Sequence, residues 1–214
     1  MRLTIFRHAQ TAGNLEKRYL GATDEPLCET GLETACRRAN ELREAWNRAR
    51  VSAKDPIAAG KALPVEPDVV YASPRLRCLQ TARILFPCAD IVIVPQLAEM
   101  DFGVFEGKNC FDLATDEDYR AWVEGGCVGR CPDGENRAEF VERIVAGLAA
   151  VESEAARRAN TQAVIAAHAG TALAARFAER MGTCDYFDLR LGFCESIDIE
   201  FPFGAAPGNA GAQR

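Results

Sequence analysis

The stretch Leu3-Thr4-Ile5-Phe6-Arg7-His8-Ala9-Gln10-Thr11 decides the fold that we expect for this chain. Its first four residues are apolar or β-branched, and the residues from 7 to 14 are mostly polar. A short apolar run that ends in a polar loop is typical of a buried strand. We therefore expect a strand at 3–6, with candidate functional residues directly after it.

Similar apolar runs recur along the chain and alternate with helical patterns. The expected strands lie at 69–71, 91–94, 163–167 and 196–201, and the expected helices at 31–49, 74–85, 116–123, 135–158 and 172–181, with Pro74 in the first turn of its helix. Strands that alternate with helices predict an α/β fold, here a three-layer αβα arrangement around a mainly parallel sheet.

Three segments lack a clear period. Residues 51–67 contain three prolines and a glycine, so we expect a flexible surface connection there. The irregular stretch 97–133 is long enough to be a functional lid or a binding insertion. The Gly/Ala/Pro tail at 204–214 is expected to be disordered, which leaves one domain over 1–203.

The composition excludes several classes of partner. The chain has 214 residues, 48% of them hydrophobic, a net charge of -6 and a pI near 5.1. An acidic protein of this kind is not expected to bind nucleic acid or an anionic membrane, although a local cluster of arginines can still bind an anionic substrate. No apolar run has the length of a signal peptide or a membrane span, so we expect a cytoplasmic protein. The oligomeric state stays open, with a homodimer as one alternative.

Nine cysteines raise the question of disulfides or a metal site. The number is odd and no export signal is present, so we expect reduced thiols. Cys127 and Cys131 are the closest pair, but a zinc site needs two further ligands, and both histidines lie far away in sequence. We therefore expect no metal site and no cofactor.

The two histidines each follow a predicted strand. His8 comes after the first strand and His168 after the fourth. In an open parallel sheet, ligands bind at the carboxyl ends of the strands. A single histidine of this kind is more often structural, but two at strand ends favour a functional site.

Arginines follow the same pattern. Arg7 directly precedes His8, Arg18 lies in the loop after the first strand, and Arg75 follows the second. One loop arginine is usually a solvated charge. Three arginines that converge on one edge of a sheet would bind phosphate, because guanidinium groups match phosphate oxygens bidentately.

Four ordered blocks of residues resemble the motifs of the histidine phosphatase (phosphoglycerate mutase-like) superfamily. They are Arg7-His8-Ala9-Gln10-Thr11 with Asn14, Arg18, Gly21, Pro26-Leu27 and Gly31; Ser73-Pro74-Arg75 with Arg77 and Gln80-Thr81-Ala82; Leu97-Ala98-Glu99-Met100-Asp101-Phe102-Gly103 with Glu106-Gly107; and His168-Ala169-Gly170. The resemblance extends over roughly residues 2–200 and implies a phosphoglycerate mutase-like fold.

The resemblance also implies roles for individual residues. His8 would be the nucleophile that becomes a phosphohistidine, and Glu99 the proton donor. Arg7, Arg75 and His168 would form the phosphate pocket. Further phosphate contacts would come from Asn14, Arg18, Ala169 and Gly170. Asp101 stays open as a rival acid, because it lies only two residues from Glu99.

Two positions depart from the family pattern, in which a glycine follows the nucleophile and a Ser or Thr often precedes the second histidine. Here they are Ala9 and Ala167. A methyl group at position 9 is tolerable if the backbone φ there is negative, whereas Ala167 removes one hydroxyl contact. We interpret both changes as tuning of the site.

The substrate that the resemblance implies is a small phosphorylated metabolite, hydrolysed without a metal ion. Residues 97–122, 132–135 and 140–143 are similar to the alpha-ribazole phosphatase branch of cobalamin biosynthesis. The alternatives are a broad-specificity sugar or phosphoglycerate phosphatase, a phosphoglycerate mutase, and a catalytically idle protein that binds a phosphorylated ligand.

Overall fold

The computed structural model describes residues 1–51 and 65–203. Its strands are β1 (Arg2–Arg7), β2 (Val69–Ala72), β3 (Asp90–Ile93), β4 (Gln162–Ala167) and β5 (Ser196–Glu200). Its α-helices are α1 (Ala12–Leu15), α2 (Glu29–Val51), α3 (Leu76–Leu85), α4 (Glu117–Glu124), α5 (Arg137–Arg157) and α6 (Ala169–Glu179), with 3-10 turns η1 (Pro95–Leu97) and η2 (Gly103–Phe105). None of the helices in these ranges is both long and apolar enough to cross a membrane.

The strands form one sheet in the order β3-β2-β4-β1-β5. β1, β2, β3 and β4 run parallel, and β5 pairs antiparallel with β1 at the edge. The expectation of a mainly parallel sheet is confirmed. All the parallel strands therefore end on the same side of the sheet.

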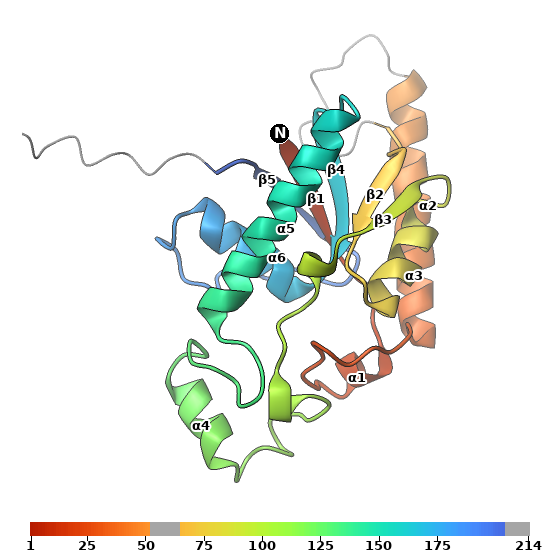
Figure 1. Ribbon diagram of the computed structural model, residues 1–214. Coiled ribbons are helices and arrows are strands. Elements are labelled where there is room, and N and C mark those ends of the chain that lie inside the picture. Colours follow the sequence, from red (N-terminus) through yellow and green to blue (C-terminus); the bar gives the residue numbers. More distant parts are fainter. Residues whose placement is uncertain (52–64, 204–214) are drawn as a thin grey trace, which may run out of the picture.

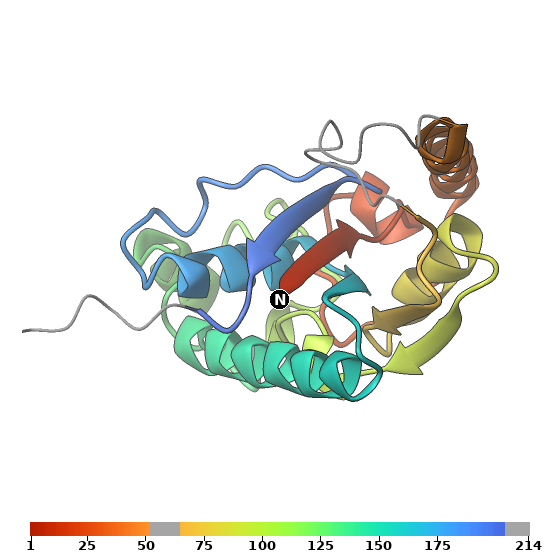
Figure 2. The same cartoon turned by 90° about the horizontal axis from the view of Figure 1, so that it is seen from above.

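Helices cover both faces of the sheet, which gives three layers (Figures 1 and 2). Successive side chains of a strand point to opposite faces. Leu3 and Ile5 of β1 accordingly belong to the core under α5 and α6, while Phe6 packs with Trp46 and Phe86 in the core under α2 and α3. Because both faces are buried, the central strands are nearly continuous apolar runs.

The predicted elements are present, with three differences. Pro74 lies before its helix, which begins at Leu76 after Arg75 as N-cap, so the expectation of Pro74 in the first turn was wrong. The polar segment after β1 contains the short helix α1, whose N-cap Thr11 forms a capping box with Asn14. Helix α6 begins three residues before the predicted start, directly after His168.

The irregular stretch 97–133 holds the turn η2 and the helix α4 within otherwise non-repetitive backbone. In Figure 1, α4 and α1 lie beyond the end of the sheet opposite the N-terminus. The predicted flexible connection at 51–67 falls mostly, and the predicted tail at 204–214 falls entirely, outside the described residues.

Hydrogen bonds between strand ends place the candidate residues side by side. The backbone N–H of His8 donates to Ala167 O over 2.9 Å, and that of Ser73 donates to Ala166 O over 3.0 Å. Residues that follow β1, β2 and β4 therefore share one edge of the sheet.

Candidate active site

The two histidines face each other at this edge. Their ring centroids lie 5.2 Å apart with an interplanar angle of 70°. His8 is 5% exposed and His168 is fully buried. The chain therefore brings together two imidazoles that are 160 positions apart in sequence.

One ring nitrogen of His8 has a fixed role. Its Nδ1 lies 2.7 Å from Ala9 O. A carbonyl oxygen can only accept, so Nδ1 carries the proton and Nε2 keeps the free lone pair. Burial, with the charges of Arg77 and Arg7, lowers the pKa of His8 to about 3. The imidazole is thus neutral at physiological pH, as a nucleophile must be.

The backbone that carries His8 tolerates the alanine after it. Ala9 is not among the residues with positive φ, so its methyl group is unstrained. Its N–H donates to the hydroxyl of Thr81, 2.9 Å away. This bond fixes the backbone directly after His8.

His168 is held by polar groups from the segment after β2 and from α3. Its Nε2 lies 2.7 Å from Ser73 Oγ and 3.5 Å from the Sγ of the buried Cys78. Burial raises the pKa of the Cys78 thiol to about 12, which keeps it neutral. Burial and the neighbouring His8 and Arg77 lower the pKa of His168 well below its usual value. An anion beside His168 would favour its protonated form.

Arg7 is fixed from two sides. One guanidinium nitrogen, NH1, donates to Leu191 O over 2.6 Å, and the guanidinium carbon lies 3.9 Å from the centre of the Phe193 ring. The remaining guanidinium N–H groups are free for an anion. Stacking of this kind holds the cation in place without neutralising it.

Most of the candidate residues surround one cavity of about 370 Å³. The candidates that line it are Arg7, His8, Asn14, Arg18, Glu99 and Ala169. Ala169 begins helix α6, and the N-terminal end of a helix favours negative charge. The cavity thus combines a neutral imidazole, two guanidinium groups and a helix N-terminus.

Two candidate phosphate ligands are already engaged with other groups. The Arg18 guanidinium is ion-paired with Glu16 at 2.5 Å and with Asp112 at 3.5 Å. The side-chain oxygen of Asn14 accepts from the N–H of Thr11, which leaves only the donor end of this amide for an anion. Neither residue matches the simple expectation of an unpaired phosphate ligand.

Three further candidates, His168, Arg75 and Gly170, do not line this cavity, and His168 is fully buried beneath it. Arg75 precedes α3 at the end of β2, and its charge contributes to the lowered pKa of His168 after burial, His8 and Arg77. The N–H of Gly170 donates to the carboxylate of Glu99 over 3.0 Å, so this group is not directed at the cavity. Gly170 as a phosphate contact therefore stays a prediction, with its N–H directed at Glu99 in this structure.

Glu99 and Asp101 differ clearly in their surroundings. Glu99 lines the cavity of His8, and burial raises its pKa even though the N–H groups of Met100 and Gly170 oppose this. The carboxylate of Asp101 instead accepts from the N–H of Gly103 at 2.9 Å and caps a turn. The geometry favours Glu99 as the acid.

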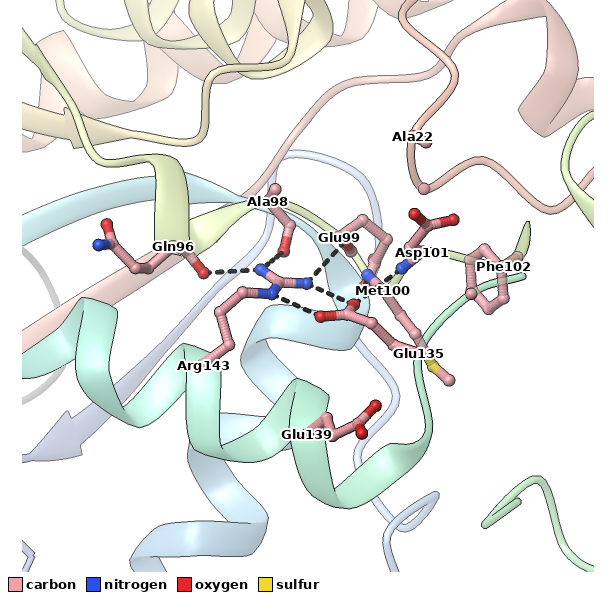
Figure 3. Close-up of polar contacts among 12 residues, drawn as sticks. Ala22, Gln96, Ala98, Glu99, Met100, Asp101, Phe102, Glu135, Glu139 and Arg143 are labelled. Carbon is pink, nitrogen blue, oxygen red and sulfur yellow. Dashed lines mark hydrogen bonds and ion pairs between the residues drawn. The ribbon is translucent and has the colours of Figure 1, made fainter. Parts of the chain in front are cut away.

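Arg143 of α5 holds the segment that carries Glu99 (Figure 3). Its NH1 donates to Gln96 O at 2.8 Å and to Ala98 O at 2.9 Å, and its NH2 donates to Glu99 O at 3.1 Å. The same guanidinium binds Glu135 over 2.6 and 2.7 Å. A rigid fork of five donors suits this arrangement, which a lysine could not replace.

Glu135 completes the support from the other side. Its carboxylate accepts from the N–H of Asp101 at 2.9 Å, and its own N–H donates to Asp101 O at 2.9 Å. Arg143 and Glu135 together therefore bind the backbone on both sides of Glu99. Sequence reasoning identified these two residues only as parts of a motif.

We expect Arg143→Gln to lower the free energy of unfolding by about 2–3 kcal/mol, because Glu135 and three backbone carbonyls lose their partner in a half-buried site. Urea denaturation measures this. The control is Arg157→Gln on the same helix, where an exposed ion pair is removed and little change is expected. Equal losses in both variants would contradict a supporting role for Arg143.

The loop at 20–23, next to the cavity, is also held by charged side chains that bind its backbone. The buried Arg77 donates to the carbonyls of Leu20, Gly21 and Thr23. The Glu106 carboxylate accepts from N–H groups of the same loop, among them that of Gly21 at 2.8 Å. A Cβ on Gly21 would lie 1.7 Å from Met100 O, so only glycine allows this close approach.

The cysteines of the described residues are separate from one another. All nine are free thiols in this structure. Within residues 1–51 and 65–203, no three or more His, Cys, Asp or Glu side chains are grouped so that they could hold a metal ion. The chemistry of this edge of the sheet is that of histidines, arginines and one carboxyl group.

This fold and site define an α/β protein with a histidine–arginine cavity at the carboxyl edge of its sheet. The chain belongs to the histidine phosphatase superfamily (branch 1), whose family model matches residues 3–54 and 57–201. The phosphoglycerate mutase-like fold predicted from the sequence is thereby confirmed.

The chain is also similar in sequence to curated relatives and in structure to solved proteins. "Probable phosphoglycerate mutase GpmB" of Enterobacter sp. (strain 638) is 34% identical over 154 residues, which cover 70% of this chain and 62% of the relative, so the match spans less than two thirds of that protein. The alpha-ribazole phosphatase from Shigella flexneri has a TM-score of 0.70 at 25% identity and covers 94% of this chain and 90% of its own. YhfR from Bacillus stearothermophilus, at 23% identity and a TM-score of 0.72, covers 93% of this chain and 90% of its own and shares the fold.

Proposed function

We propose that this protein hydrolyses phosphomonoesters through a phosphohistidine on His8. The observation that carries the proposal is the neutral His8 imidazole, whose proton is held on Nδ1 by Ala9 O, in a cavity shared with Arg7 and Glu99. Its free Nε2 can attack phosphorus, and Arg7 supplies positive charge for the phosphoryl oxygens. His168, neutral in the absence of a ligand, would add a second charge if the bound phosphate favours its protonated form.

The proposed reaction has two steps. In the first, the bond from phosphorus to the ester oxygen breaks as the Nε2–P bond forms, and Glu99 gives its proton to the departing alkoxide. In the second, water attacks the phosphohistidine, the Glu99 carboxylate takes a proton from that water, and orthophosphate leaves. His8 and protonated Glu99 are both restored.

The substrate belongs to the proposal as well. Alpha-ribazole phosphate is the first candidate, supported by the similarity to the Shigella flexneri phosphatase over nearly the whole chain. A phosphoglycerate phosphatase or mutase is the second candidate, and the name of the Enterobacter relative favours it. Comparing kcat/KM for alpha-ribazole phosphate, 3-phosphoglycerate and sugar phosphates separates these candidates, and release of orthophosphate separates a phosphatase from a mutase.

We expect nitrophenyl phosphate turnover to change less than about twofold when EDTA is added, because the side chains themselves supply the nucleophile and the positive charge. The measurement is release of nitrophenol with and without chelator. If EDTA abolished turnover and a divalent metal restored it, the proposed metal-independent reaction would be wrong. If the parent protein formed no phosphoenzyme and released no nitrophenol, an idle binding protein would be favoured instead.

A further inference from the structure

The backbone that follows His8 is held by groups that are distant in sequence. On one side lies the start of α2, where the N–H of Cys28 donates to Gln10 O over 3.0 Å. A Cβ on Gly31 would lie 2.0 Å from Gln10 O, so a glycine is needed for α2 to approach this closely. The other side of the same backbone faces α3.

Thr81 of α3 binds the peptide that links His8 to Ala9. The Ala9 N–H donates to Thr81 Oγ1 over 2.9 Å, and Thr81 Oγ1 donates to Arg77 O over 2.7 Å. The hydroxyl proton is thereby used within the helix, which leaves the oxygen lone pairs to accept from Ala9. Thr81 and Ala9 are both fully buried, so bulk water does not compete for these bonds.

Ala9 is hydrogen-bonded at both of its backbone polar groups. Its N–H donates to Thr81, and its carbonyl oxygen accepts from Nδ1 of His8 over 2.7 Å. Its methyl group packs in a small apolar cluster with Leu27 and Ala35. The direction of the Ala9 carbonyl therefore depends on Thr81, and the position of the His8 proton depends on that carbonyl.

The position of this proton decides whether His8 can react. A neutral imidazole carries one proton, and the hydrogen bonds of its two nitrogens decide which of them holds it. A proton on Nε2 would remove the lone pair that attacks phosphorus. Arg7 is held by other groups, Leu191 O and the Phe193 ring, so phosphate binding does not depend on the same hydroxyl.

We infer that Thr81 is a positioning residue for the nucleophile: its hydroxyl, through the Ala9 peptide, keeps the proton of His8 on Nδ1. This inference rests on the proposed phosphatase activity, to which it adds the group that selects the reactive tautomer. Thr81 is not among the described residues that line the cavity of His8. Its effect on the reaction is therefore transmitted by Ala9.

The test compares Thr81→Ala with Thr81→Ser, since both lack the methyl group and only serine keeps the hydroxyl. We expect Thr81→Ala to slow phosphoenzyme formation from nitrophenyl phosphate about 10- to 100-fold in single turnovers, as for a misplaced reacting group. Thr81→Ser should stay within about twofold of the parent protein, and so should the inhibition constant of orthophosphate in both variants, because Arg7 is undisturbed.

Nitrogen NMR of the histidine rings gives a readout that a merely structural role would not move. The chain has two histidines, so the signals that are missing from His8→Ala belong to His8. The two ring nitrogens have different shifts according to which of them carries the proton. We expect the Nδ1–H form alone in the parent protein and in Thr81→Ser, and a mixture with the Nε2–H form in Thr81→Ala.

Thr4→Ala is the matched control on β1. The Thr4 hydroxyl is also buried, and it donates to Asp198 over 2.7 Å, away from the cavity. This variant should lower the urea midpoint much as Thr81→Ala does, because each loses a buried hydrogen bond. The rate and the His8 tautomer should stay as in the parent protein.

Two results would overturn the positioning role. One is a folded Thr81→Ala variant with the rate and the His8 tautomer of the parent protein, and the other is an equal loss in Thr81→Ser, which would assign the effect to the methyl group. If Thr81→Ala does not fold, Thr81→Val keeps the volume and replaces it. A parent protein without His8-dependent hydrolysis would count against the phosphatase function, whereas the tautomer comparison would still decide the role of Thr81.

Discussion

His8→Ala is expected to lower kcat for nitrophenyl phosphate by about 10⁴-fold or more, because the variant lacks the nitrogen that accepts the phosphoryl group. Among the residues that the structure describes, no other side chain near the cavity offers an equivalent nucleophile: His168 is fully buried against Ser73, and the Cys78 thiol is kept neutral by its raised pKa. Steady-state release of nitrophenol measures the loss.

Rapid quenching gives the more specific test. The parent protein should carry an acid-labile phosphoryl group after reaction with labelled substrate, and His8→Ala should carry none. His168→Ala serves as the matched control, since it removes the other imidazole of the pair and should form the phosphoenzyme slowly but detectably. Undiminished labelling of His8→Ala would disprove the assignment of the nucleophile.

Glu99→Gln is expected to slow phosphoenzyme formation by about 10²- to 10⁴-fold for alkyl phosphates, the range typical of a lost general acid. The amide keeps the size of the side chain and can still accept from the N–H of Gly170. Single-turnover rates should fall far less for nitrophenyl phosphate, whose leaving group needs no proton. An equal loss for both esters would rule out the acid role.

The pH profile gives an independent check on Glu99. Burial raises its pKa, so the proton is retained to higher pH than in an ordinary glutamate, and single-turnover rates with alkyl phosphates should fall as pH rises through that pKa. This alkaline limb should disappear in Glu99→Gln. Asp101→Asn is the control, and it should keep the limb because that carboxylate caps a turn at Gly103. The rate should also fall at acidic pH, where His8 becomes protonated, and this fall should be centred near the His8 pKa of about 3.

The sheet and its carboxyl edge were predictable because they depend on local pattern. Apolar runs at Leu3, Val69 and Ala163 mark strands that are buried on both faces, and parallel strands end on a common side. That rule places His8 and His168 at the same edge of the sheet, whereas their direct proximity depends on the pairing of β1 with β4. The edge strand β5 was also located, although its antiparallel direction depends on tertiary pairing with β1.

The supports of the site were not predictable in this way. Arg77, Glu106 and Arg143 act mainly on backbone N–H and C=O groups of distant loops. Backbone groups are the same in every residue, so the sequence carries no sign of which carbonyl a guanidinium will reach. The engagement of Gly170 by Glu99 was missed for the same reason.

The two ends of the site rest on different parts of the chain. The histidines follow β1 and β4, whereas most aromatic side chains beside Glu99 come from the 97–133 stretch and from residues after α6, with Tyr19 and Phe140 as exceptions. Substitutions at those aromatic positions, unlike one at Glu99, can alter which compound is recognised without removing a group that takes part in the transfer. Descendants of such a protein could therefore acquire new metabolic roles while keeping one unaltered reaction.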